Sequence, residues 1–116
     1  MPGMAAQDEV MRLTEALPEF AAELWTLLGT AGEHEHAEKV PTLRIVTRCR
    51  WRDVFCASFY TAPPPRGAYG PGHRTIVLEP EHGMINVDVV GRAIVHVEVL
   101  YRDEVRSRLA RILATT

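Results

Sequence analysis

The sequence predicts an α+β domain in which an N-terminal helix, a five-stranded, mainly antiparallel sheet and a C-terminal helix follow one another. Apolar residues recur every three or four positions over residues 7–28 and 102–114, which is the period of a helix. Between residues 43 and 100 the apolar residues mostly alternate with polar ones, which is the period of a strand. Short turns separate most of these strands, which favours a meander with the helices on one face. The chain has 116 residues, so we expect one domain over residues 1–116.

Pro18 interrupts the first helical pattern. Proline lacks an N–H group and clashes with the preceding turn, so it either kinks a helix or begins a new one. Two structures remain open: one kinked helix, or a short helix followed by a second that has Pro18 in its first turn. Gly29 and Gly32 are typical helix stops. One apolar stripe supports the helix in either case: Val10, Leu13, Leu17, Phe20, Leu24 and Leu27.

The strands are predicted from alternation and from turn residues. A first hairpin joins residues 43–51 to residues 54–61, with its turn at Arg52 and Asp53. Three further strands cover residues 74–79, 84–90 and 93–100. Between these groups lies a connection rich in proline and glycine, residues 62–73, and loops of that length are usually functional or disordered.

The turn at Arg52 and Asp53 places Thr47 opposite Ser58 and Cys49 opposite Cys56. Directly opposed cysteines lie near the separation that a disulfide needs, so a redox-sensitive pair is one hypothesis. The alternative is two buried, inert thiols, because free cysteine is among the most buried residue types. Two cysteines do not form a disulfide framework, and we expect a reducing compartment.

The other face of this hairpin combines arginines with phenylalanines. Side chains of these types can bind phosphates and stack on bases, as in proteins that bind single-stranded nucleic acid. The same face could dock an acidic protein partner, or form a homodimer through its phenylalanines. In the simplest alternative, the rings belong to the core and the arginine stems lie around its edge. The residues are Arg48, Arg50, Arg52, Phe55 and Phe59.

The last hairpin provides weak candidates for catalysis. If Val89 lies opposite Ala93, one face is uniformly apolar, and the other carries Asn86, Ile94 and the three candidates Asp88, His96 and Glu98. Thr75 and Glu79 of the neighbouring strand could join them. A histidine beside carboxylates suits acid–base catalysis or a divalent metal. A solvent-facing sheet surface carries the same residue types without any chemistry.

Two other segments contain polar residues of interest. In the connection over residues 62–73, Arg66, Tyr69 and His73 form either a contact surface or a plain link, since tyrosine and arginine are enriched at binding sites. His34 and His36 are two residues apart, which does not place both on one face of a helix. We therefore expect residues 33–36 to be an exposed polar turn, and we expect neither a metal nor another cofactor.

Charge is unevenly distributed. Residues 1–40 carry two basic and eight acidic side chains, and residues 41–76 carry six basic and one acidic. This asymmetry indicates a nucleic-acid surface, an acidic partner, or simply an acidic helix packed near a basic hairpin. No apolar run is long enough to cross a membrane, and no secretory leader precedes the domain, so a cytoplasmic location is expected.

Three functions follow in order of preference. The first is a small non-enzymatic module that binds another protein, of the bacterial immunity or antitoxin-like kind. The second is binding of single-stranded nucleic acid through the arginine–phenylalanine face. The third is a small acid–base or metal-dependent enzyme that uses Asp88, His96 and Glu98. No nucleophile elbow, phosphate-binding loop or dinucleotide fingerprint is present to favour an enzyme.

Overall fold

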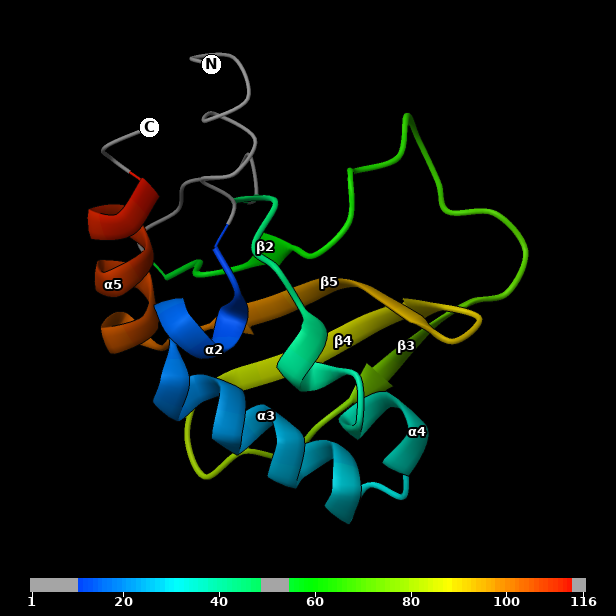
Figure 1. The fold of residues 1–116 in the computed structure, drawn as a ribbon, viewed down its shortest axis with the longest axis horizontal. Coiled ribbons are helices and arrows are strands. Elements are labelled where there is room, and N and C mark those ends of the chain that lie inside the picture. The colour runs from blue at the N-terminus through cyan, green and yellow to red at the C-terminus, as the bar shows by residue number, and fades with distance from the viewer. Residues whose placement is uncertain (1–10, 49–54, 114–116) are drawn as a thin grey trace.

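The computed structural model describes residues 11–48 and 55–113 and confirms the α+β class (Figure 1). Within the described residues three helices precede the sheet, and a single turn of 3-10 helix over Val40–Thr42 leads into it. The helices are α2 (Leu13–Ala16), α3 (Pro18–Thr30), α4 (His34–Ala37) and α5 (Asp103–Leu113). The strands are β1 (Thr47–Arg48), β2 (Phe59–Tyr60), β3 (His73–Val77), β4 (Met84–Val90) and β5 (Ala93–Leu100). Among the described residues no helix has the length and apolar character needed to span a membrane.

The N-terminal helix is split at Pro18 rather than kinked. Leu17 separates α2 from α3 with the non-helical angles φ −136° and ψ 68°, and Pro18 occupies the first turn of α3. Proline fits there because the first N–H groups of a helix have no partner within the helix. The apolar stripe is thereby divided between two helices, and both pack on the sheet.

The five strands form one antiparallel sheet in the order β1-β2-β5-β4-β3, which is not a pure meander. The C-terminal strand β5 lies between β2 and β4, so β2 and β3 are not neighbours. The connection over residues 61–72 must therefore pass from one side of the β4–β5 hairpin to the other, and it arches well away from the sheet (Figure 1). This path explains why the chain needs so long a connection at this point.

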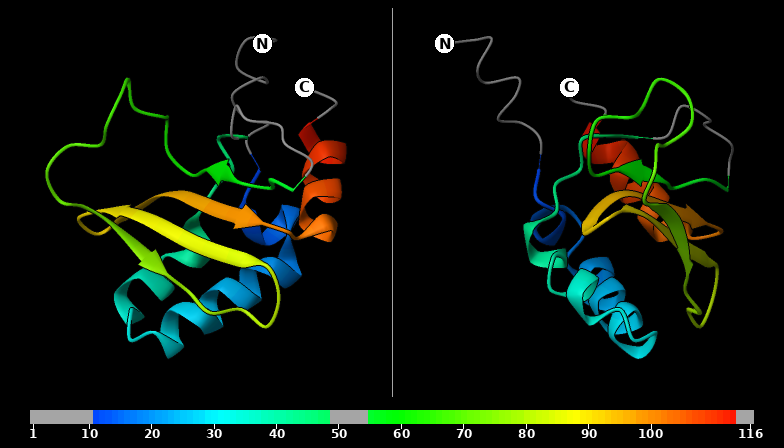
Figure 2. Two further views of the ribbon diagram at one scale, coloured as in Figure 1. Left: turned by 180° about the vertical axis from the view of Figure 1, so that it is seen from behind. Right: turned by 90° about the vertical axis from the view of Figure 1, so that its right-hand side faces the viewer.

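Helices α2, α3 and α4 cover one side of the sheet (Figure 2). Apolar side chains of α3 meet alternate residues of β4 and β5, and the ring of Phe20 packs edge-on against that of Phe59 with centroids 6.1 Å apart. Helix α5 adds its own apolar stripe, as its sequence pattern predicts. Fully buried members of this core include Leu13, Leu24, Leu28, Phe59, Ile85, Val87, Val97, Val99 and Leu109.

The register predicted for the first hairpin is wrong by two residues. Thr47 lies opposite Tyr60, and Arg48 lies opposite Phe59. The predicted turn at Arg52 and Asp53, and Cys49 with it, falls outside the described residues. Cys56 is a buried free thiol whose Sγ donates to the hydroxyl of Ser58 at 3.5 Å. A two-residue shift keeps each side chain on its face, which is why Arg48 and Phe59 still share one.

The register predicted for the last hairpin is also wrong. Asp88 pairs with His96, whereas Val89 pairs with Ile94, so Val95 is an extra residue in β5. This bulge turns Ile94 into the core, although the alternating pattern placed it on the polar face. The sequence contains no glycine or proline at the bulge to signal it.

Candidate functional site

One row of directly paired residues crosses four strands on the face of the sheet opposite the helices. Thr75 of β3 pairs with Asp88 of β4, Asp88 pairs with His96 of β5, and His96 pairs with Tyr60 of β2. Side chains that are directly opposite on neighbouring strands have Cβ atoms about 5 Å apart. The sheet therefore brings four polar side chains from distant parts of the chain into contact.

Asp88 is the centre of this row. Its Oδ1 accepts hydrogen bonds from the Thr75 hydroxyl at 2.6 Å and from His73 Nε2 at 2.9 Å, and its Oδ2 accepts one from His96 Nδ1 at 2.9 Å. Burial alone would raise the pKa of Asp88, but the three hydrogen bonds outweigh it and hold the pKa below its ordinary value. Asp88 is therefore a carboxylate whose two oxygens are both used to orient neighbours.

His96 is fixed on two sides. Because a carboxylate can only accept, the Nδ1 of His96 carries the proton that Asp88 binds. Its ring packs against that of Tyr60, with centroids 4.5 Å apart. Its other nitrogen, Nε2, is shielded from solvent and has no hydrogen-bond partner. In the neutral ring this Nε2 is a bare lone pair, which is a proton acceptor.

The loop over residues 61–72 supplies one more side chain to this group, Tyr69. Tyr69 stacks on His73 with ring centroids 4.7 Å apart, and its hydroxyl is shielded from solvent and has no hydrogen-bond partner. Burial, followed by the charges of Tyr60 and Asp88, raises the pKa of Tyr69, so its hydroxyl keeps its proton. We call His73, Thr75, Asp88, His96, Tyr60 and Tyr69 the Asp88 cluster.

Of the three weak catalytic candidates, the structure brings two into contact. Asp88 and His96 are hydrogen-bonded, and Thr75 joins them. Glu98 lies on the same face in the next row and accepts a hydrogen bond from Asn86 instead, and Glu79 lies beyond the end of β3. Within residues 11–48 and 55–113, no three histidine, cysteine, aspartate or glutamate side chains are arranged to hold a metal ion.

The lowered pKa of Asp88 predicts an acid-sensitive contribution to stability. A carboxyl whose pKa is lower in the folded state stabilises the fold above its unfolded pKa, about 4, and stops doing so as pH falls through the folded pKa. We expect Asp88→Asn to reduce the free energy of urea unfolding at neutral pH. The difference from the unsubstituted protein should shrink as pH falls below about 4. A difference that stays constant down to pH ~2 would contradict this role of the carboxylate.

A second surface of interest is apolar and lies at the end of the sheet where β4 begins. Val77 is 69% exposed, Met84 46% and Tyr101 60%, and Tyr101 stacks on the partly exposed Phe55 with ring centroids 5.3 Å apart. Met84 and Val77 share the uncovered sheet face as diagonal neighbours. Tyr101 is the one described residue other than glycine with a positive φ, 61°. We call Phe55, Val77, Met84 and Tyr101 the apolar patch.

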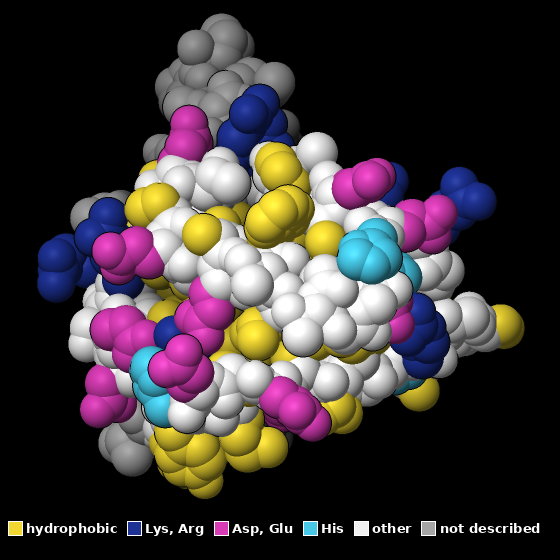
Figure 3. All heavy atoms as spheres, turned by 90° about the horizontal axis from the view of Figure 1, so that it is seen from below, with side chains coloured by type: hydrophobic (Ala, Val, Ile, Leu, Met, Phe, Trp, Pro, Cys, Tyr) yellow, Lys and Arg dark blue, Asp and Glu magenta, His cyan; other side chains and the backbone are white. Residues whose placement is uncertain are grey.

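Acidic side chains border this patch. His82 Nε2 lies 3.9 Å from Glu104 Oε2, so the turn before β4 and the start of α5 are side by side. In Figure 3 hydrophobic side chains gather at one edge of the face, beside several acidic ones. The exposed acidic residues of the two segments are Glu79, Glu81, Asp103 and Glu104.

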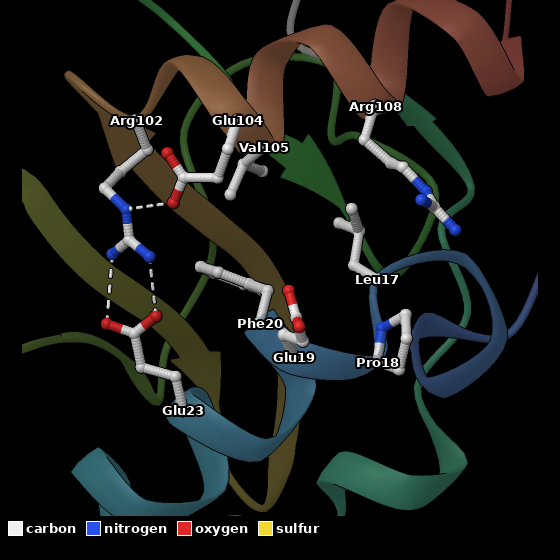
Figure 4. Close-up of a pocket in the computed structure, with 9 residues that line it drawn as sticks. All are labelled: Leu17, Pro18, Glu19, Phe20, Glu23, Arg102, Glu104, Val105 and Arg108. Carbon is white, nitrogen blue, oxygen red and sulfur yellow. Dashed lines mark hydrogen bonds and ion pairs between the residues drawn. The ribbon is translucent and has the colours of Figure 1, made fainter.

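Arg102 anchors this region, because it is buried and binds two acidic side chains, Glu23 and Glu104. Its guanidinium binds both oxygens of Glu23 at 2.7 and 3.0 Å, and its Nε binds Glu104 at 2.8 Å (Figure 4). The hydrogen bonds to Glu23, above all, raise the pKa of Arg102 further. Beside it, an open cavity of about 420 Å³ separates α3 from α5 and is lined partly by Glu19 and Arg108. Arg102 therefore offsets part of the charge of Glu104, and Glu79, Glu81 and Asp103 carry the rest of the negative charge of this acidic rim.

The arginine–phenylalanine face predicted from the sequence is not an exposed platform. Phe59 is 0% exposed and belongs to the core, so it can neither stack on a base nor form a dimer interface. Arg48 is half-buried opposite Phe59, while Arg50 and Arg52 lie outside the described residues. Phe55 is exposed, but it stacks on Tyr101 in the apolar patch. In the loop, Arg66 is exposed, whereas Tyr69 and His73 belong to the Asp88 cluster.

Residues 33–36 do not form the exposed turn expected from the sequence, because His36 is buried. Its Nδ1 lies 3.0 Å from Glu33 Oε1 and its Nε2 lies 3.2 Å from the carbonyl oxygen of Gly91. Glu33 also binds both terminal nitrogens of Arg74, at 2.8 and 3.0 Å. The hydrogen bond from Arg74 is the main reason that the pKa of Glu33 is lowered. These contacts join α4 to β3 and to the β4–β5 turn, and bring part of the acidic segment against the basic one.

Comparison of the chain with protein-family models, curated proteins and solved structures gave no match.

Proposed function

We propose that this protein is a small module that binds another protein through the apolar patch. One observation supports this most directly: Val77, Met84 and Tyr101 are large apolar side chains that remain mostly exposed at one end of a sheet face that no described helix covers. Exposed apolar patches rimmed by polar residues are typical of protein-binding surfaces. The positive φ of Tyr101 costs free energy, and strained residues of this kind cluster at functional positions.

The acidic rim indicates the partner. Glu79, Glu81, Asp103 and Glu104 favour a protein whose apolar anchor is surrounded by lysine and arginine. They disfavour nucleic acid at this surface, because phosphates would face carboxylates. They also disfavour a symmetric pair of copies, in which each rim would face its own equivalent. In this proposal the present protein is the acidic member of the pair, and its target is a basic protein, for example one that binds nucleic acid. Such a pairing suits the immunity or antitoxin-like class.

The test compares two variants that exchange an exposed apolar side chain for lysine. Met84→Lys lies in the patch, and Trp25→Lys lies on α3, where Trp25 is similarly exposed. Each protein is used to capture partners from the source lysate, and any captured protein is purified for affinity measurement. We expect one basic partner, whose Kd rises at least tenfold with Met84→Lys and does not change with Trp25→Lys. Its binding should weaken as the salt concentration rises.

Three results would contradict the proposal. One is a set of partners that binds both variants equally, and another is capture of nucleic acid alone. The third is a homodimer in native mass spectrometry that Met84→Lys converts to a monomer, which would assign the patch to a second copy of this chain.

A further inference from the structure

We infer that Asp88 and His96 form a general-base pair that can activate water toward a small neutral carbonyl compound beneath the loop over residues 61–72. This activity is independent of the apolar patch. It follows from three features of the Asp88 cluster: an oriented imidazole, two shielded polar atoms without partners, and aromatic walls.

The first feature is the fixed orientation of the His96 imidazole. The 2.9 Å hydrogen bond between His96 Nδ1 and Asp88 Oδ2 fixes both the ring plane and the position of the proton. Asp88 is itself held by Thr75 and His73 through its other oxygen, so the carboxylate has little freedom to turn. A carboxylate that fixes a histidine in this way leaves Nε2 as a base and stabilises the imidazolium that forms when Nε2 takes a proton.

The shielded atoms indicate what the cluster binds. His96 Nε2 can accept a hydrogen bond, and the hydroxyl of Tyr69 can donate one. Leaving a shielded polar atom without a partner is unfavourable, so the cluster favours ligands that supply a donor to Nε2 and an acceptor to the Tyr69 hydroxyl. Water and a neutral carbonyl compound do so together, because the water donates to Nε2 while the carbonyl oxygen accepts from the Tyr69 hydroxyl. An anionic ligand is disfavoured, because it would lie near the Asp88 carboxylate.

Aromatic rings border the cluster. The rings of Tyr60 and Tyr69 pack on His96 and His73 respectively, so the site is bordered by aromatic faces. Both orphan atoms are shielded from solvent, so the proposed reaction requires the loop that carries Tyr69 to move when substrate binds. Gly67 and Gly72 flank Tyr69 with φ of 132° and 88°, values that glycine adopts without strain.

The reaction is ordinary hydrolysis. As the water oxygen bonds to the carbonyl carbon, one water proton passes to His96 Nε2. The bond from that carbon to the leaving oxygen then breaks, and the leaving group departs as the alcohol or its anion. The imidazolium returns its proton to the leaving group or to solvent, so ester and water give acid and alcohol with no oxidant or reductant.

The experiment uses 4-nitrophenyl acetate as the probe and follows release of 4-nitrophenolate by the whole protein. We expect His96→Gln to lower the rate about 100-fold and Asp88→Asn at least tenfold. His34→Gln, which changes an exposed histidine on α4, should leave the rate unchanged. Equal rates for His96→Gln and His34→Gln would overturn the inference.

A second measurement does not depend on activity or on how a variant folds. Long-range ¹H–¹⁵N NMR of the unsubstituted protein reports which nitrogen of each histidine carries the proton. We expect the neutral form of His96 to carry it on Nδ1. A proton on Nε2 would remove the base and overturn the inference even if some hydrolysis were observed.

Discussion

Replacing Arg102 with methionine is expected to destabilise the protein by about 3 kcal/mol, because it leaves Glu23 without its partner at a mostly buried position. The Arg102 side chain is 6% exposed and joins α5 to α3 and, through the carbonyl oxygen of His82, to the turn before β4. Gly83 shows how tightly it is packed: a Cβ there would lie 2.6 Å from Arg102 Cδ. The effect therefore includes lost packing as well as lost charge.

The measurement is urea unfolding at neutral pH, with Arg92→Met as the matched control. Arg92 also pairs with a glutamate, Glu35, but at 3.7 Å and with both side chains mostly exposed, so its loss should cost less than about 0.5 kcal/mol. Arg102→Lys should recover only part of the stability, since lysine cannot bind both oxygens of Glu23 in a planar pair. A cost for Arg102→Met as small as that for Arg92→Met would show that the buried pair does not hold the helices together.

Phe59→Ala is expected to cost about 3–5 kcal/mol, the range for a large aromatic side chain removed from a core. Phe59 is fully buried, its ring meets that of Phe20, and its strand β2 is only two residues long. Phe55→Ala should cost about 1 kcal/mol or less, because Phe55 is partly exposed and its main contact is the stacked ring of Tyr101.

Phe59→Ala and Phe55→Ala together distinguish a loss of stability from a loss of partner binding. We expect Phe55→Ala to weaken partner capture while the midpoint of unfolding changes little. If the two substitutions cost equal free energy, then Phe59 is not the core residue that the structure shows, and the arginine–phenylalanine face would again be a candidate binding surface.

Much of the fold could be predicted from the sequence, because it depends on short-range patterns. The periods of 3.6 and 2 give the helices and the strands, and the break at Pro18 follows from the chemistry of proline. The position of β5 between β2 and β4 could not be predicted. Strand order depends on which apolar faces pack together across the whole chain, and residues 59–60 and 96–97 are far apart in sequence.

The candidate site, like the fold, could be predicted from the sequence only in part. Sequence alternation placed Asp88, His96 and Glu98 on one polar face, and the sheet confirms that arrangement. It could not show that Glu98 turns to Asn86, because registers depend on a bulge at Val95 that no glycine or proline signals. Nor could it show that Tyr60 and Tyr69 would enclose His96 and His73, since those contacts require the β2–β5 pairing and the long loop.

The sequence by itself therefore determined the class of fold, the limits of β4 and β5 and nearly those of α5, and the residue types from which a polar site could be built, because each depends on neighbours within one helix or hairpin. Only the tertiary structure decided that Phe59 lies in the core, that His36 and Arg102 are buried and hydrogen-bonded, and that Asp88 orients His96. The physical reason is common to all of these residues. Burial and hydrogen bonding depend on surfaces contributed by distant segments, and a local pattern carries no information about which segments those are.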